Sequence, residues 1–218
     1  MSRRNNNTTA EAAPADTAGW QAQKSASTRL QIVEAALRCF VELGYAKTTT
    51  TAIAEKAGLS RGAMLHHFPS KLDIVRAAVE HLHAKRLKAF RKSIDRLARD
   101  ESRARKALEA YWEHVRHPMY VAFLELWVAA RTDPELAAIL TPAQESFERE
   151  WYRTAVDVFP EWRDSGENFD VALDLVHYVM DGMAVSFPAH EHGEHEKRLL
   201  AYLEKQMHEL SSRKITRS

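Results

Sequence analysis

The 218-residue chain has few of the residues that break helices, cross-link a protein or anchor it in a membrane. Seven glycines and seven prolines are few for this length, which disfavours a β-sandwich with many tight turns. Cys39 is the single cysteine, so neither an internal disulfide nor a cysteine metal cluster can form. No run of 18 apolar residues occurs, and residues 1–20 lack the apolar segment of a secretory signal. We therefore expect a cytoplasmic protein without a membrane contact.

Charge is nearly balanced overall but unevenly distributed. The net charge is +1, with 31 Lys and Arg against 30 Asp and Glu. The segment from Lys24 to Lys71 holds seven basic and three acidic residues, whereas the chain after it is slightly acidic. A basic segment on an acidic body is typical of a module that binds a polyanion.

Hydrophobic spacing predicts that the first ordered element is a helix. Residues 1–25 are polar and lack periodicity, so we expect them to form a disordered tail. From Ser27 onward, apolar residues recur at steps of three and four, and Gly44 is a suitable residue to end such a helix. The predicted inward face consists of Leu30, Val33, Leu37, Phe40 and Val41.

Capping residues predict the start of the next three helices. Thr48–Thr51 precede a short apolar segment, Ser60 precedes a helix over about 61–68, and Ser70 precedes a longer fourth helix. The apolar stripe of the fourth helix slips near His83 and Arg86, which we interpret as the place where this helix changes neighbours.

The remainder of the chain also has helical spacing. Pro118 and Asp133-Pro134 are expected at helix starts, and we expect a bend or interruption at Pro142. No strand is predicted. The expected fold class is all-α, with a tail over 1–25, a three-helix head over 26–71 and a larger helical domain over 72–218. Later helices are expected over about 134–159, 169–187 and 194–211, with a loop over 159–168.

The segment from Ile53 to Phe68 has the spacing of a helix-turn-helix motif. Small Ala54 and Ala57 allow two short helices to cross closely, and Gly58 can adopt a positive φ in the turn. A capping residue at Ser60 would leave the N-terminus of the second helix exposed to a phosphate or to the major groove.

These residues resemble the DNA-binding head of the TetR family of transcriptional regulators. The resemblance implies a helical homodimer that represses promoters and leaves DNA when a small molecule fills a cavity in the C-terminal domain. It covers about 28–75, and Leu65 departs from it, because the family commonly has tyrosine there. The matching residues are Ala36, Phe40, Gly44, Thr48, Ile53, Ala54, Ala57, Gly58, Leu59, Ser60, Gly62, His67, Phe68, Ser70, Lys71 and Leu72.

The resemblance assigns DNA-contact roles to residues around the second helix of the motif. Arg61 is the candidate for reading a guanine edge, and Leu65 could contact a thymine methyl group. His66 is assigned to a phosphate or a base edge and Lys71 to a phosphate. The alternative is that these residues form an ordinary solvated surface. The predicted DNA-binding set is Thr48, Thr50, Ser60, Arg61, Gly62, Leu65, His66 and Lys71.

The helix expected over 169–187 carries two apolar stripes, which predicts burial on both sides. One stripe can face the domain core, and a second copy of the chain is the simplest partner for the other. The alternative is a helix buried at the centre of a monomer. The predicted dimer interface is Val171, Leu175, Tyr178, Gly182, Val185, Leu199, Leu203 and Met207.

Large aromatic residues gather in the C-terminal domain beside a few polar groups. By resemblance to the family they would line a cavity for a small-molecule effector of unknown identity, although core packing is the alternative for each one. The predicted ligand-binding set is Trp112, Tyr120, Phe123, Trp127, Phe147, Trp151, His177 and Asp181.

Other functions have less support in the sequence. His190, His192 and His195 lie in a polar stretch that is typical of a solvated linker, so neither a metal nor another cofactor is expected. No catalytic constellation stands out. We predict a DNA-binding repressor acting as a homodimer on a palindromic operator; the alternatives are a DNA-binding regulator without an effector and a helical enzyme.

Overall fold

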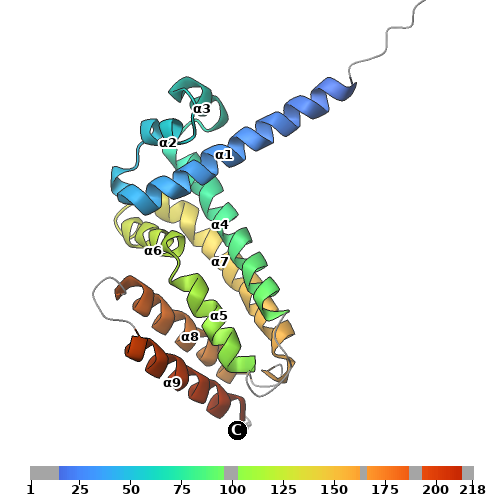
Figure 1. Ribbon diagram of the computed structural model, residues 1–218, viewed down its shortest axis with the longest axis vertical. Coiled ribbons are helices and arrows are strands. Elements are labelled where there is room, and N and C mark those ends of the chain that lie inside the picture. Colours follow the sequence, from blue (N-terminus) through green and yellow to red (C-terminus); the bar gives the residue numbers. More distant parts are fainter. Residues whose placement is uncertain (1–14, 96–102, 163–165, 187–192, 213–218) are drawn as a thin grey trace, which may run out of the picture.

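The computed structural model describes residues 15–95, 103–162, 166–186 and 193–212, and these are helical apart from short connections. No strand occurs within these ranges, which confirms the all-α prediction. Figure 1 shows the small helices α2 and α3 at one end of the molecule and α8 and α9 at the other. The elements are α1 (Ala15–Lys47), α2 (Thr50–Lys56), α3 (Arg61–His67), α4 (Lys71–Ile94), α5 (Arg103–Val115), α6 (Pro118–Ala130), α7 (Pro134–Val158), the 3₁₀ turn η1 (Pro160–Trp162), α8 (Glu167–Ser186) and α9 (Gly193–Ser212).

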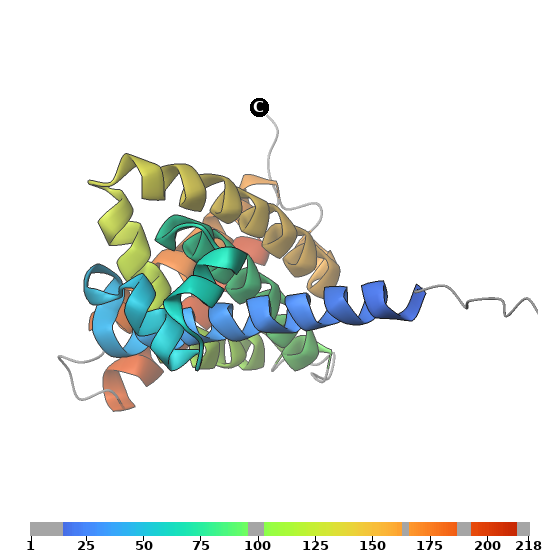
Figure 2. The ribbon, with the colours of Figure 1, turned by 90° about the horizontal axis from the view of Figure 1, so that it is seen from above.

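The predicted tail is wrong over its last residues, because α1 begins at Ala15. The first part of α1 projects beyond the rest of the molecule, as Figure 2 shows from above. Four alanines, two glutamines and one lysine lie between Ala15 and Thr28, and these residue types extend a helix without needing a buried face. Residues 1–14 lie outside the described ranges.

Side-chain caps define the helices of the head as the sequence predicted. The Thr49 hydroxyl accepts a hydrogen bond from the Ala52 amide, and the Ser60 hydroxyl accepts one from Ala63. Ser70 and Asp73 form a reciprocal capping box at the start of α4. These caps satisfy N–H groups that would otherwise lack partners at each helix start.

Positive φ angles occur at the two glycines expected to need them. Gly44 has a φ of 74° near the end of α1, and Gly58 has a φ of 67° in the turn between α2 and α3. Side chains other than glycine rarely adopt this conformation, so both positions favour glycine.

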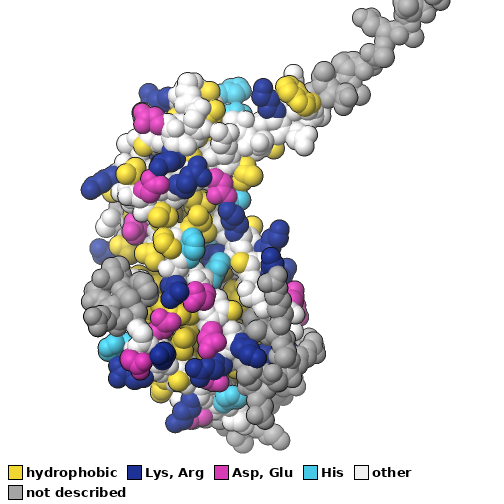
Figure 3. Space-filling model, viewed as in Figure 1, with side chains coloured by type: hydrophobic (Ala, Val, Ile, Leu, Met, Phe, Trp, Pro, Cys, Tyr) yellow, Lys and Arg dark blue, Asp and Glu magenta, His cyan; other side chains and the backbone are white. Residues whose placement is uncertain are grey.

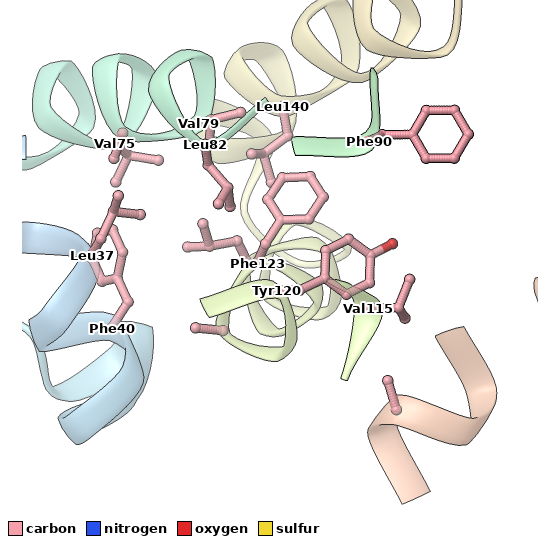
Figure 4. Close-up of a cluster of buried hydrophobic side chains, with 14 of the residues drawn as sticks. Leu37, Phe40, Val75, Val79, Leu82, Phe90, Val115, Tyr120, Phe123 and Leu140 are labelled. Atoms are coloured by element: carbon pink, nitrogen blue, oxygen red, sulfur yellow. The ribbon is translucent and has the colours of Figure 1, made fainter. Parts of the chain in front are cut away.

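The head core lies between α1, α2, α3 and the first half of α4. Figure 4 shows Val75 of α4 facing Leu37 and Phe40 of α1. The burial predicted for two residues of α1 is wrong, because Leu30 is 49% exposed and Val41 is 40% exposed. Both lie at the edge of the apolar stripe, and Ile32, Ala35 and Ala36 fill the centre of the interface instead.

The larger body is built around α4 and α7, which pack along each other (Figure 1). In the body, α5 packs on α4 and α9, α6 packs on α7, and α8 packs on α5 and α9. Helix α7 continues through Pro142 rather than stopping there, and part of the predicted loop after it is η1. The head touches the body twice, because α1 also packs against α6.

Candidate functional site

The short helix α3 presents one face to solvent and holds the other in the head core. Arg61, Gly62 and His66 are exposed, while Met64 is fully buried and Phe68 is 1% exposed. No heavy atom lies within 4 Å of the position that a Gly62 side chain would occupy. The exposed face of α3 is therefore open to a close approach by another molecule.

Helix α1 holds the motif in position through two side chains that the sequence analysis did not single out. Arg29 donates a hydrogen bond from Nη1 to the His67 carbonyl oxygen at 2.5 Å, and its guanidinium lies 4.0 Å from the Phe68 ring centroid. Gln31 donates from Nε2 to the Ala57 carbonyl oxygen at 2.6 Å. Because α2 ends beside Ala57 and α3 ends at His67, these contacts fix the end of both helices.

Thr48, assigned to DNA in the sequence analysis, lies inside the head. Thr48 is 1% exposed, and its hydroxyl donates to the Gly44 carbonyl oxygen at 2.8 Å, so its assignment as a DNA contact is corrected. The hydroxyl satisfies a carbonyl where the helical path of α1 is interrupted. Thr50, at the start of α2, and Leu65 are half-buried.

Lys71, also assigned to DNA, is tied to the head. Its ammonium group donates to the Tyr45 carbonyl oxygen at 2.7 Å and lies 3.9 Å from the Tyr45 ring centroid. Burial lowers the pKa of Lys71, with the charge of Asp133 acting in the opposite direction.

The body contains a cavity of about 280 Å³ between α5, α7 and α8. Three residues of the predicted ligand set, Phe147, Trp151 and His177, contribute to its wall. Its other lining residues were not in that set: they are Tyr111, Glu148, Tyr152, Asp170, Leu173, Asp174 and Tyr178.

A chain of polar contacts continues from this cavity into the core. The Tyr111 hydroxyl lies 3.1 Å from His177 Nδ1, and His177 Nε2 lies 3.5 Å from Asp181 Oδ2. The Tyr120 hydroxyl donates to Asp181 Oδ1 at 2.7 Å. Burial raises the pKa of Asp181, while His177 and the bond from Tyr120 act in the opposite direction.

The remaining aromatic residues of the predicted ligand set lie in the core or pack against it instead of lining this cavity. Trp112 and Phe123 are each 2% exposed, and Trp127 packs edge-on against Phe123 with ring centroids 6.3 Å apart. Their large side chains lie on faces of α5 and α6 that turn toward neighbouring helices. Aromatic composition alone does not separate these positions from the cavity wall.

Helices α8 and α9 carry exposed apolar side chains that no other described part of the chain covers. Figure 3 shows hydrophobic side chains among charged ones on this part of the surface. On α8, Val171 is 53% exposed, Tyr178 70% and Val185 58%. Leu199 and Tyr202 of α9 are 38% and 55% exposed. We call these five residues the α8–α9 face.

The assignment of two residues to the dimer interface is corrected, because both are buried within the chain. Leu203 is fully buried and Met207 is 9% exposed, so both pack inside their own chain, where α9 meets α5 and α8. The inward stripe of α9 is Leu200, Leu203 and Met207, and the exposed apolar residues lie one helical position to the side. Leu175 is half-buried and Gly182 is exposed, with space around it.

Comparison with known proteins identifies the family. The model described as bacterial regulatory proteins, tetR family, matches residues 32–78. The uncharacterized HTH-type transcriptional regulator Rv2912c of Mycobacterium tuberculosis is 27% identical over 170 residues, which are 76% of this chain and 85% of that protein. A TetR-family transcriptional regulator from Mesorhizobium loti has a solved structure with a TM-score of 0.70 and 14% identity, covering 86% of this chain and 96% of that one. The chain belongs to the TetR family.

A further solved structure shows the same fold as this TetR-family protein. The transcriptional regulator FadR of Bacillus subtilis, solved in complex with stearoyl-CoA, matches with a TM-score of 0.59 and 17% identity, covering 84% of this chain and 97% of that one. The relatives and structural neighbours are transcriptional regulators, so the TetR-family protein is a regulator and not an enzyme.

The sequence predicts neither a membrane contact nor a metal site in this TetR-family protein. In the described ranges, no helix is long and apolar enough to cross a membrane. In the same ranges, no group of three His, Cys, Asp or Glu residues is placed to hold a metal ion. His195 is exposed at the start of α9, whereas His190 and His192 lie outside the described residues.

Proposed function

We propose that this TetR-family regulator is a repressor that binds a palindromic operator as a homodimer and is released by a small-molecule effector. The exposed face of α3 is the observation that carries the proposal. Arg61 lies on the first turn of that helix, after the Ser60 cap, with free space around Gly62. A helix placed this way can enter the major groove with its first residues toward the base edges.

The α8–α9 face supports assembly into a homodimer. Exposed apolar side chains on two helices that pack against each other are costly in water and are typical of an interface. A two-fold dimer repeats the head, so the operator would contain two inverted half-sites about 34–36 Å apart. Such a protein would act in the cytoplasm, where the DNA is.

The cavity beside Tyr111 and His177 supports an effector. It has aromatic walls and a few polar groups, which is typical of sites for small organic ligands. FadR of Bacillus subtilis was solved with stearoyl-CoA, so a protein with this fold binds a small molecule. An effector that favours one separation of the two heads over another would weaken operator binding through a coupling free energy.

The first test is selection of bound DNA from random duplexes with the wild type and Arg61→Ala. We expect an inverted repeat for the wild type. Loss of a bidentate contact to guanine should cost about 1–3 kcal/mol and relax specificity at one symmetric pair of positions. Arg149→Ala is the control, because Arg149 is an exposed arginine on α7 in the body. An unchanged sequence preference for Arg61→Ala would remove this residue from the interface.

A DNA-binding regulator without an effector is the second candidate. It is supported by the packing of Trp112, Phe123 and Trp127, three predicted ligand residues that lie in the hydrophobic core or pack against it. A thermal-shift screen separates the two, because a ligand that binds the native state raises the melting temperature.

A further inference from the structure

The wall of the cavity of about 280 Å³ carries charged groups of one sign only. Glu148 of α7 and Asp170 and Asp174 of α8 line it, and no described lysine or arginine does. Asp170 lies in the first turn of α8, where the helix dipole favours a carboxylate, but Asp174 lies one turn further along the same face. Two like charges at this spacing destabilise each other. A hollow lined in this way attracts cations and repels anions.

No basic side chain in the described ranges forms an ion pair with these three carboxylates. Arg149, the residue next to Glu148, points its guanidinium toward Glu145 at 3.9 Å instead. Glu148 accepts a hydrogen bond from the neutral Gln144 side chain at 2.9 Å, which leaves its charge uncompensated. The negative charge of the cavity wall is therefore available to a bound molecule.

The buried cation Arg86 of α4 lies behind the wall of this cavity and is not part of it. It is 1% exposed, and its guanidinium carbon lies 4.1 Å from the Tyr120 ring centroid and 4.2 Å from that of Phe147. Phe147 lines the cavity and so separates this charge from the space inside. The charged groups that a ligand would meet directly are the three carboxylates.

Aromatic rings form much of the remaining wall. The Trp151 ring centroid lies 4.8 Å from that of Tyr111 and 5.9 Å from that of Phe147. Tyr152 and Tyr178 also line the cavity and are 43% and 70% exposed. The face of an aromatic ring attracts an ammonium group through its quadrupole. Rings and carboxylates on one wall therefore favour the same kind of ligand by two separate interactions.

A smaller cavity of about 40 Å³ adjoins this site and is almost entirely apolar. The two cavities share Tyr111, Trp151, Leu173 and His177 as lining residues. Beyond these four the smaller cavity is lined only by apolar side chains, such as Phe90. A ligand that extends from the carboxylates past the shared residues would place its far end among apolar side chains, where burial is favourable.

We propose that the effector is an organic cation with an apolar body, bound in these two adjoining cavities. The proposal rests on the proposed function as an effector-responsive regulator. The ammonium group lies among Glu148, Asp170 and Asp174, and the apolar body passes Trp151 toward the smaller cavity. Tyr178 belongs both to the cavity wall and to the α8–α9 face, so an occupant reaches the proposed dimer interface.

The test uses three series of probes that differ only in the charge of one end. A 2-phenylethyl, a 2-(indol-3-yl)ethyl and an octyl group each carry an ammonium, a hydroxyl or a carboxylate group. Calorimetry at millimolar concentration measures their binding to the full chain. We expect at least one ammonium compound to bind about 10-fold more tightly than its hydroxyl counterpart, and the carboxylates to bind most weakly. Raising the salt concentration should reduce this preference.

The double variant Asp170→Asn, Asp174→Asn removes two of the carboxylates from exposed positions, where the substitutions should not disturb the fold. We expect about 5–20-fold weaker binding of the ammonium compound and little change for the hydroxyl compound. Tyr152→Leu, which removes a ring and keeps an apolar side chain, should weaken the ammonium compound by about 2–5-fold. Glu167→Gln is the matched control, because Glu167 is an exposed carboxylate in the first turn of α8 that does not line the cavity.

The proposal is overturned if no ammonium compound binds more tightly than its hydroxyl counterpart. It is also overturned if the double variant binds the ammonium compound like the wild type, or if Glu167→Gln weakens binding equally.

Operator binding is measured separately with the same probes. An ammonium compound that depends on the two aspartates for binding but leaves operator affinity unchanged would support the cation site and contradict release by an effector. Release of the operator by the hydroxyl or carboxylate compounds, but not by the ammonium compounds, would support an effector and contradict the cation site.

Discussion

His83 and Arg86 lie within one turn of α4, and both are buried in the body. They continue the inward stripe formed by Val79 and Leu82, so the stripe does not slip as the sequence suggested. The His83 ring packs between Phe123 and Phe147, with centroid distances of 5.0 and 4.7 Å. Polar side chains thus replace apolar ones at core positions without interrupting the helix.

The burial of His83 predicts a dependence of stability on pH. Burial, together with the charge of Arg86, lowers the His83 pKa from 6.5 to about 3. The unfolded chain therefore binds a proton at a pH where the folded chain does not. Stability from this residue is fully present above pH 6.5 and is lost as the pH falls toward 3, with a slope of up to about 1.4 kcal/mol per pH unit.

Urea unfolding between pH 5 and pH 7 would check this prediction with His83→Phe, which keeps an aromatic ring at the site. We expect the free energy of unfolding of the variant to fall less steeply than that of the wild type as the pH decreases. His114, whose pKa burial lowers to about 4, is retained in both and contributes equally. Parallel curves for the two proteins would contradict a neutral buried His83.

At the scale of elements, α8 has two faces with different surroundings. Phe169, Ala172 and Met180 lie on the inner face and are at most 2% exposed. The outer face carries Val171, Tyr178 and Val185, which are exposed apolar residues at helical spacing. This division agrees with the two stripes read from the sequence, and the outer one has no cover in the described chain.

The outer face of α8 is tested by Val185→Glu. A carboxylate buried without a partner at an interface should cost about 3–5 kcal/mol, so we expect monomers and weaker operator binding. Val128→Glu is the control, because Val128 is an equally apolar residue on α6 that is 69% exposed. Sedimentation velocity distinguishes the species. An intact dimer for Val185→Glu, or dissociation of Val128→Glu, would place the interface elsewhere.

The helix boundaries of the head could be predicted because caps and glycines act locally. Thr49, Ser60 and Ser70 define their helices through neighbouring amides, as expected. The roles of side chains were harder to predict. Thr48 and Leu203 have the residue types of a DNA contact and an interface, but their burial depends on which helices pack against them. Spacing along one helix does not contain that information.

The cavity shows the same limit. Phe147, Trp151 and His177 were predicted to line the cavity and do so. Trp112 is also a large aromatic residue of the predicted set, but it is buried in the core. The one available signal for Arg86 was its position in the apolar stripe of α4, where an apolar residue was expected. That signal was interpreted as a change of phase rather than as a buried charge.

At the scale of the whole molecule, two connections join the head to the body. Helix α4 packs on α1 in the head and on α5 and α7 in the body. The end of α1 also packs on α6, where a side chain at Gly44 would meet Glu125 Oε2 at 3.4 Å. A change in the body can therefore reach α3 through the length of α4 and through the position of α1.

Two leucines of α4 test the first connection. Leu72 and Leu87 are both half-buried, but Leu72 lies at the head end and Leu87 at the body end. We expect Leu87→Ala to change the coupling free energy, which is given by the ratio of operator affinities without and with the effector, by about 0.5–2 kcal/mol. Leu72→Ala should change both affinities alike. Fluorescence anisotropy measures them, and an unchanged ratio for Leu87→Ala would mean that α4 only supports the fold.

The projecting part of α1 has a consequence for how the protein unfolds. Between Gln21 and Thr28 every side chain is exposed or half-buried, whereas contacts with the rest of the head begin at Arg29 and burial begins at Ile32. A helix without tertiary contacts is marginally stable in water and frays from its free end. Its amide hydrogens should exchange with solvent far faster than those beyond Ile32, which open only with the head core. The two parts of this continuous helix therefore unfold separately. The outer turns can rearrange on a surface such as DNA while the head core stays folded.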